Sequence, residues 1–132
     1  MQRQKEPLQN GRHPRVLIVD DDDELAEVLR QALRESGYAV ATVRHGAAAL
    51  ELIGQIQPDL ILLDLKMPIM DGWSFVGQLR RGGKASGRIV LLSGHPNVRD
   101  ISLSLGADAF VGKPFELTEL LGTLQQQLGA TG

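Results

Sequence analysis

The sequence predicts an α/β fold, in which one doubly wound sheet of five parallel strands carries helices on both faces. Short apolar runs alternate with longer stretches that have apolar residues at helical spacing, and this alternation occurs five times. The runs are mostly continuous rather than alternating, which is typical of strands covered on both faces. Right-handed crossovers between parallel strands place the helices on both sides of the sheet.

The first strand is expected at Val16–Val19, a continuous apolar run. Asp22 or Asp23 can cap the helix that follows, and Gly37 can end it. The spacing of one buried helix face is shown by Leu25, Val28, Leu29, Ala32 and Leu33.

The second strand is expected at Tyr38–Val43, and the third at Leu60–Leu63. The helix between them should run to about Gln57, and Pro58 separates it from the third strand. Its apolar positions are Ala47, Leu50 and Ile53.

A loop that carries Pro68, Asp71 and Gly72 should follow the third strand. The next helix shows an apolar face and should end near Gly82–Gly83, inside the flexible loop Gly82–Gly87. The apolar positions are Phe75, Val76 and Leu79, and Trp73 should pack at the start of this helix.

Ile89–Leu92 is the fourth predicted strand, and a helix near Val98–Leu105 should stop at Gly106. Ala109–Gly112 is the fifth strand. The last helix is marked by Leu117, Leu120, Leu121, Leu124 and Leu128.

The chain has 132 residues, a length typical of a single compact domain. We expect a flexible tail at residues 1–14, the domain at 15–128 and a short tail at 129–132, with no space for an output domain. The formal net charge of −2 gives no indication of a nucleic-acid partner, and the apolar runs are too short to cross a membrane. The absence of cysteine excludes disulfides and is compatible with a cytoplasmic location.

Polar residues follow four of the five predicted strands. In an open parallel sheet, ligands bind outside the carboxyl ends of the strands. Three carboxylates, a hydroxyl and an ammonium are expected there: Asp20, Asp21, Asp64, Ser93 and Lys113. Clustered carboxylates repel one another, and one lysine offsets only part of that charge. A hard divalent cation with oxygen ligands, such as Mg²⁺, would neutralise the rest and leave room for a phosphoryl group.

Four segments in order resemble the receiver domains of two-component response regulators, in particular the stand-alone, chemotaxis-regulator-like kind. They are VLIVDDD (16–22), PDLILLDLKMPIMDG (58–72), IVLLSGHP (89–96) and GADAFVGKPF (106–115). The resemblance covers residues 15 to about 128 and implies a flavodoxin-like (βα)₅ fold with strand order 2-1-3-4-5.

The resemblance implies that Asp64 is the phosphoryl acceptor. Asp21, Asp64 and the backbone carbonyl of Lys66 would bind Mg²⁺ or Mn²⁺ directly, and Asp20 would act through water. Lys113 would pair with the acceptor and then with the phosphoryl group.

The same resemblance assigns a switch. Ser93 would move inward to hydrogen-bond the phosphate, and Phe110 matches the aromatic position that follows this movement. Lys66 and His95 match the positions that tune the phosphoryl lifetime, and Pro114 would follow a cis peptide bond.

The resemblance further implies a phosphorylation-driven switch rather than a turnover enzyme. A sensor histidine kinase or a histidine phosphotransfer protein would be the donor, and an unidentified protein would be the target, reached through the fourth helix, fifth strand and fifth helix. Autodephosphorylation would be slow. Nucleic acid and membrane are not expected as direct partners, and the sequence leaves open whether phosphorylation produces a homodimer.

Other readings stay open at this point. The chain could be an interaction module that no longer takes phosphate, although its acidic set is complete. A magnesium-dependent phosphatase would need an acid where Lys66 stands, and a flavin phosphate would be repelled by the acidic run after the first strand. Taken singly, Ser93 could be a loop hydroxyl and Phe110 plain core.

Overall fold

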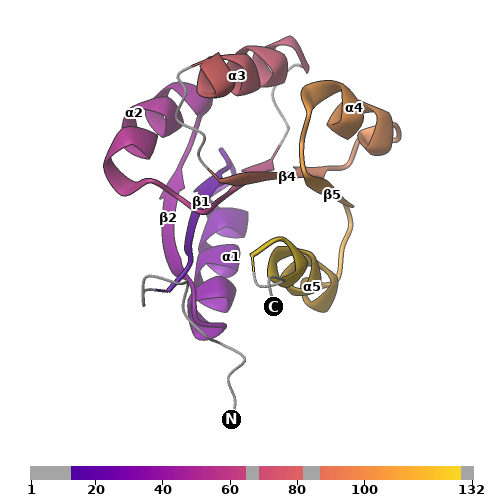
Figure 1. Ribbon diagram of the computed structural model, residues 1–132. Coiled ribbons are helices and arrows are strands. Elements are labelled where there is room, and N and C mark those ends of the chain that lie inside the picture. Colours follow the sequence, from indigo (N-terminus) through magenta and orange to yellow (C-terminus); the bar gives the residue numbers. More distant parts are fainter. Residues whose placement is uncertain (1–12, 65–68, 82–86, 129–132) are drawn as a thin grey trace.

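The computed structural model describes residues 13–64, 69–81 and 87–128, which form one sheet and the helices that cover it (Figure 1). The strands are β1 (Arg15–Val19), β2 (Ala39–Val43), β3 (Leu60–Asp64), β4 (Arg88–Ser93) and β5 (Ala109–Gly112). The helices are α1 (Asp23–Glu35), α2 (Gly46–Ile56), α3 (Ile69–Arg81), α4 (Val98–Leu105) and α5 (Leu117–Leu128). All strand pairs are parallel and the order is β2-β1-β3-β4-β5, so the expected fold class is confirmed.

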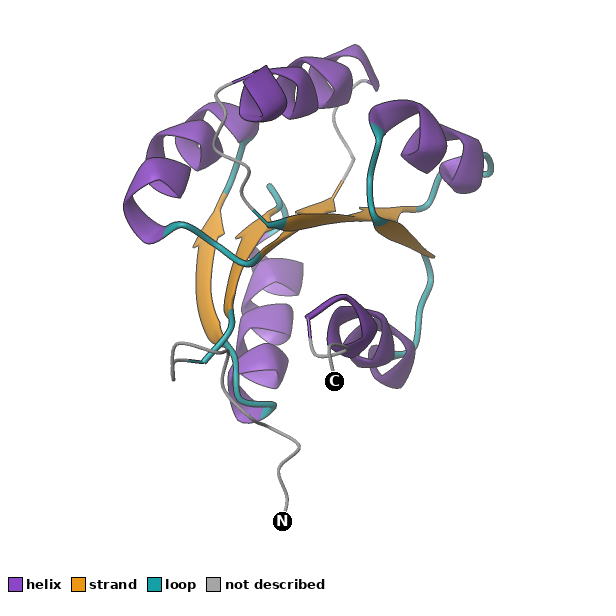
Figure 2. Ribbon diagram, in the orientation of Figure 1, coloured by secondary structure: helices purple, strands orange, loops and turns teal. Residues whose placement is uncertain are grey.

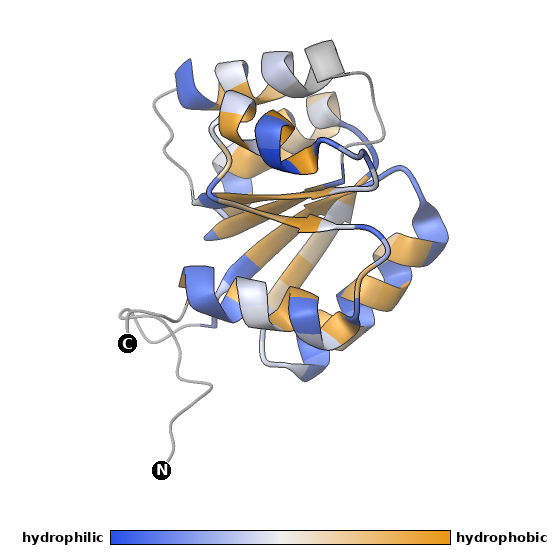
Figure 3. Ribbon diagram, turned by 90° about the vertical axis from the view of Figure 1, so that its right-hand side faces the viewer, coloured by the Kyte–Doolittle hydropathy of each residue, from blue (hydrophilic) through white to orange (hydrophobic). Residues whose placement is uncertain are grey.

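The sheet separates two layers of helices. Helices α2, α3 and α4 cover one face, and α1 and α5 cover the other (Figure 2). In β3, Ile61 and Leu63 pack toward the first layer, and Leu60 and Leu62 toward the second. Figure 3 shows mostly hydrophobic strands between helices that carry both hydrophilic and hydrophobic residues. Burial on both faces explains why these strands are continuous apolar runs.

The buried face of α1 differs from the expected one at a single position. Leu29 and Leu33 are buried as expected, but Val28 is 60% exposed and Ala26 is buried in its place. Ala26 and Val28 lie about 200° apart around the helix, at opposite margins of its apolar face, so a rotation of the helix against the sheet covers Ala26 and exposes Val28. The N-cap is Asp22, whose carboxylate accepts hydrogen bonds from the amides of Glu24 and Leu25.

Helix α3 begins earlier than the sequence suggested. It starts at Ile69, so Asp71 and Gly72 are helical rather than part of a loop, while Pro68 lies outside the described residues. Proline is common just before or in the first helical turn, so the Pro68 signal fits an early start. Trp73 therefore lies one turn inside the helix, and it is 42% exposed rather than packed.

The other boundaries shift by one residue or not at all. Tyr38 lies outside β2 because its amide closes the end of α1 on the carbonyl of Leu33. Helix α2 ends at Ile56, with Gln57 in the left-handed region at φ 48°. Strand β3 extends by one residue, to Asp64, and β4 extends by one residue at each end, to Arg88 and Ser93.

The two tails fall largely outside what the structure describes, as does most of the Gly82–Gly87 loop. The domain limits 15–128 therefore stay a prediction. No helix in the described part of the chain is long and apolar enough to cross a membrane.

Gly87 lies where the backbone before β4 approaches the residue before β3. Its φ is +49°, and an added Cβ would lie 2.4 Å from the carbonyl oxygen of Asp59. The amide of Arg88 donates to that same carbonyl at 2.9 Å. Glycine is therefore required here both by the backbone conformation and by space.

We expect Gly87→Ala to lower the free energy of unfolding by about 3 kcal/mol, because it combines a left-handed backbone with a clash against backbone atoms. Gly122→Ala is the matched control. Gly122 lies inside α5 with no atom within 4 Å of an added Cβ, so alanine should raise stability by about 0.5 to 1 kcal/mol. Urea unfolding measures both, and equal effects of the two substitutions would contradict this account of Gly87.

Candidate phosphoryl-acceptor site

The carboxyl ends of the central strands lie level at one edge of the sheet. The parallel register pairs Val19 with Leu63, Asp64 with Leu92, and Ser93 with Gly112. The next residues along β1 and β5 are Asp20 and Lys113. The register therefore brings acidic, hydroxyl and basic side chains to one edge, as the sequence predicted.

Two of the predicted residues that the structure describes, Asp64 and Lys113, form an ion pair at this edge. The Lys113 Nζ lies 2.6 Å from Asp64 Oδ2, and the Asp64 side chain is 2% exposed. The backbone strengthens this placement, because the amide of Lys113 donates to the carbonyl of Ser93 at 2.9 Å. The peptide bond between Lys113 and Pro114 is cis, as expected.

Asp20 is buried beside Asp64. Its Oδ1 accepts a hydrogen bond from the amide of Asp22 at 2.9 Å, and its own amide donates to the carbonyl of Val43. Burial, together with the neighbouring Asp64 carboxyl, raises the pKa of Asp20 to about 6, against the lowering effects of the Asp22 amide and Lys113. Burial and the neighbouring Asp64 carboxyl therefore both disfavour a negative charge on Asp20.

The same two residues have oxygens suited to a cation. Asp20 Oδ2 and Asp64 Oδ1 are buried and have no hydrogen-bond partner. Unpartnered buried carboxylate oxygens are costly, and a hard divalent cation satisfies them. Among the described residues no group of three or more carboxylates or imidazoles converges as a metal site. Mg²⁺ commonly takes one or two carboxylates and keeps its waters, so this pair fits it.

The structure describes only one of the two remaining predicted metal ligands, Asp21 and Lys66. Asp21 is exposed and lines the same cavity as Asp20 and Asp64. Lys66, whose carbonyl and side chain were both given roles, lies outside the described residues. The ligand roles of both stay predictions.

Ser93 is 2% exposed at the end of β4, so it is not a loop hydroxyl in solvent. Its Oγ accepts a hydrogen bond from the amide of His95 at 3.0 Å. His95 is exposed, and its Nδ1 accepts from the amide of Asn97 at 3.0 Å. Phe110 lies on β5 with 39% exposure, so it is not plain core.

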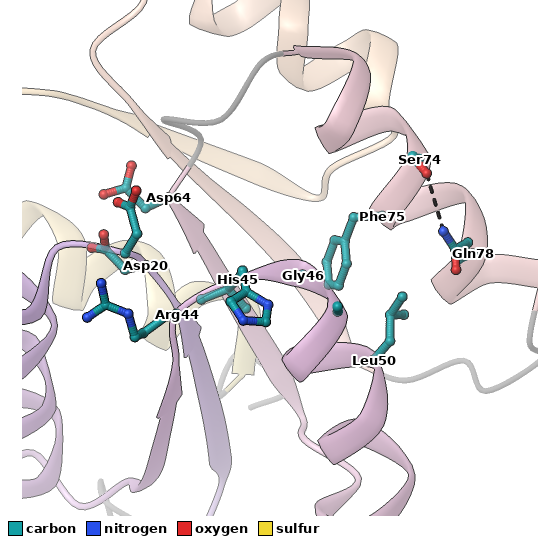
Figure 4. Close-up of a pocket in the computed structure, with 12 residues that line it drawn as sticks. Asp20, Arg44, His45, Gly46, Leu50, Asp64, Ser74, Phe75 and Gln78 are labelled. Atoms are coloured by element: carbon teal, nitrogen blue, oxygen red, sulfur yellow. Dashed lines mark hydrogen bonds between the residues drawn. The ribbon is translucent and has the colours of Figure 1, made fainter.

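A cavity of about 530 Å³ opens beside the acidic pair (Figure 4). Asp20, Asp64 and Arg44 gather at one end of it, and Phe75 and Leu50 lie toward the other. Arg44 directly follows β2, so it belongs to the same sheet edge, but it was not among the predicted site residues. Applying to β2 the rule used for the other four strands would have found it.

His45 also belongs to this cavity. It is the N-cap of α2, and its Nδ1 accepts from the amide of Ala48 at 3.3 Å. The spacing of the histidines gave no sign of this role, because a histidine N-cap has no sequence signature comparable to Ser, Thr, Asp or Asn.

Comparison with known proteins identifies one family model and several relatives that match most of the chain. Residues 16–125 match the family model described as the response regulator receiver domain. The chain is 40% identical over 121 residues to the transcriptional regulatory protein PrrA of Mycobacterium bovis, covering 90% of this chain and 52% of that protein. It is 37% identical over 116 residues to PcoR of Escherichia coli, covering 86% and 51%. The chain thus spans about half the length of these relatives.

Solved structures agree with this result. The chemotaxis protein CheY4 of Vibrio cholerae superposes with a TM-score of 0.78 at 31% identity, covering 87% of this chain and 98% of that one. The response regulator TrrA of Thermotoga maritima, solved in complex with Mg²⁺ and BeF, has a TM-score of 0.75 at 33% identity, covering 87% and 99%.

We expect Asp20→Asn to stabilise the cation-free protein more at about pH 8 than at about pH 4. The pKa of Asp20 is about 6 in the folded protein against an ordinary value of 3.8. The stability linked to this carboxyl is therefore fully present below the ordinary value and is lost as the pH rises through about 6. Asparagine does not titrate, so the difference between the two pH values should be on the order of 2 kcal/mol.

Urea unfolding in a chelating buffer measures this difference. Glu51→Gln is the control, because Glu51 is exposed on α2. The free energy of unfolding of the Glu51→Gln variant should follow that of the wild type at every pH. An Asp20→Asn curve that runs parallel to the wild type would show that Asp20 is not the group that titrates.

Proposed function

The chain belongs to the response regulator receiver domain family, and from this premise we propose that Asp64 accepts a phosphoryl group from a sensor histidine kinase or a histidine phosphotransfer protein. One observation carries the choice of Asp64. Its buried carboxylate has one oxygen held by Lys113 at 2.6 Å and the other without a partner. A carboxylate can act as a nucleophile toward phosphorus, and Lys113 holds only one of the two Asp64 oxygens.

Mg²⁺ or Mn²⁺ is the proposed cofactor. Asp21, Asp64 and the Lys66 carbonyl would hold it, with Asp20 acting through water. When bound, the cation supplies positive charge for the phosphoryl oxygens. The unpartnered oxygens of Asp20 and Asp64 and the Mg²⁺ present in the structure of TrrA support this assignment.

Lys113 and Ser93 complete the proposed site. Lys113 neutralises the acceptor carboxylate before transfer and would bind a phosphoryl oxygen afterwards. Ser93 would leave the His95 amide, to which it is bonded at 3.0 Å, and donate its hydroxyl proton to the phosphate. Lys66 and His95 are the proposed residues that set how long the phosphoryl group survives.

The proposed output surface is formed by α4, β5 and α5. Each of these three elements exposes one large hydrophobic side chain, namely Leu103, Phe110 and Leu117. Helix α4 is short, and its N-cap Asn97 makes no side-chain cap hydrogen bond. A short helix with weak capping is suited to a change of position when Ser93 moves.

We propose that the chain is a switch and not a turnover enzyme, with only slow autodephosphorylation, and that it acts in the cytoplasm where donors of this class are made. Its target is a protein, and a homodimer formed on phosphorylation would use the same surface. The longer relatives named above are regulators of transcription by name. For this chain, whose comparison covers about half of those relatives, we propose only that the output is a contact with a target protein.

Incubation with acetyl phosphate and Mg²⁺ should add the mass of one phosphoryl group to the intact protein. Asp64→Asn should gain none, because an amide is not a nucleophile toward phosphorus. A chelator should reduce the gain by about 100-fold, since unscreened carboxylates repel the incoming phosphate.

Glu51→Gln serves as the control and should be phosphorylated like the wild type. A wild type that gains no phosphoryl group from this donor or from a panel of histidine kinases would favour the phosphorylation-independent interaction module. A gain that survives Asp64→Asn would show that another residue is the acceptor.

Ser93→Ala should accept phosphate but fail to pass the change to the output surface. Hydrogen–deuterium exchange of α4 and β5 should change on phosphorylation of the wild type. The lost hydrogen bond to a charged group should lower the population of the switched state by roughly tenfold. Ser104→Ala, which changes an exposed hydroxyl on α4, should behave like the wild type. An unchanged exchange response in Ser93→Ala would remove this residue from the switch.

A further inference from the structure

One positively charged side chain lines the cavity beside Asp64 and has no role in the proposed function. Arg44 is the only lysine or arginine among the described residues that line it, because Lys113 contacts Asp64 from the opposite flank of the sheet. Arg44 follows β2, and its guanidinium lies on the same side as the carboxylates of Asp20 and Asp64 (Figure 4). A permanent positive charge next to an acceptor of phosphate is suited to an anion.

The two ends of this cavity have different chemistry. The end formed by Asp20, Asp64 and Arg44 is charged, and the end formed by Leu50 and Phe75 is apolar. Gly46 keeps the apolar end open, since an added Cβ would lie 3.1 Å from the ring of Phe75. A ligand that fits both ends has an anionic group next to a small apolar group.

Arg44 is only loosely held. Its Nη1 is paired with Asp23 Oδ1, but the two side chains are 60% and 74% exposed. Exposed ion pairs of this kind contribute little to stability. The guanidinium fork has further donors, so Arg44 can contact a second anion while it stays near Asp23.

We infer that this cavity is the leaving-group subsite for a small acyl phosphate, and that Arg44 is the residue that recognises the departing carboxylate. The inference rests on the proposed function of Asp64. The unpartnered Asp64 Oδ1 is buried and belongs to a residue that lines the cavity. The acyl methyl group would lie toward Phe75 and Leu50.

The transfer step balances without a further reactant. An Asp64 carboxylate oxygen forms a bond to phosphorus, and the bond between phosphorus and the acyl oxygen breaks. The electron pair of that bond leaves with the acyl group as a carboxylate, so no proton is needed. Negative charge therefore develops on the leaving group, and a guanidinium next to it stabilises the transition state.

A comparison of two donors tests this role. Acetyl phosphate releases a carboxylate, whereas phosphoramidate, reacting with its nitrogen protonated, releases neutral ammonia. We expect Arg44→Gln to lower the second-order rate constant of phosphorylation by about tenfold with acetyl phosphate and by less than about twofold with phosphoramidate. Asp23→Asn removes the ion pair of Arg44 and should raise the ratio of the acetyl phosphate rate constant to the phosphoramidate rate constant.

Arg34→Gln is the control for loss of positive charge. Arg34 lies in the last turn of α1, at the opposite edge of the sheet, and its variant should keep the wild-type ratio. Circular dichroism checks that each variant is folded. Equal effects of Arg44→Gln on both donors, or no effect, would overturn the inference while leaving the acceptor role of Asp64 intact. Failure of the wild type with both donors would overturn both proposals together.

Discussion

Two carboxyl groups buried side by side form the constraint on which this site depends. Asp20 follows β1 and Asp64 ends the neighbouring parallel strand β3, and the register that pairs Val19 with Leu63 places the two residues side by side. Their burial raises the pKa of Asp20 to about 6 and leaves one oxygen on each without a partner. The fold therefore places carboxylates at one edge where their charge is unfavourable, and a divalent cation with oxygen ligands would offset it.

The fold could be predicted because its strands have a simple physical signature. Leu60–Leu63 and Ile89–Leu92 are continuous apolar runs, and only strands covered on both faces require this. Once the strands are known, the edge rule brings Asp64, Ser93 and Lys113 together without any knowledge of side-chain geometry. The observed pair between Lys113 and Asp64 at 2.6 Å agrees with that juxtaposition.

The features that were mispredicted depend on tertiary packing. Val28 was expected to be buried, but the rotation of α1 on the sheet decides which margin of its apolar face is covered, and periodicity alone does not fix that rotation. Trp73 was expected to pack, but the early start of α3 moves it to an exposed position. Arg44 was missed for a different reason, because the edge rule was not applied to β2.

The charges along the carboxyl edge follow the strand order. Arg44 follows β2, the carboxylate of Asp20 follows β1, that of Asp64 ends β3, a hydroxyl ends β4 and Lys113 follows β5. A positive group thus lies on each flank of an acidic centre, but the two are held differently. The side chain of Lys113 is 21% exposed and is committed to Asp64, whereas Arg44 is 60% exposed and paired with a solvated carboxylate. Lys113 therefore holds Asp64 in place, whereas the side chain of Arg44 stays accessible to a ligand that arrives from solvent.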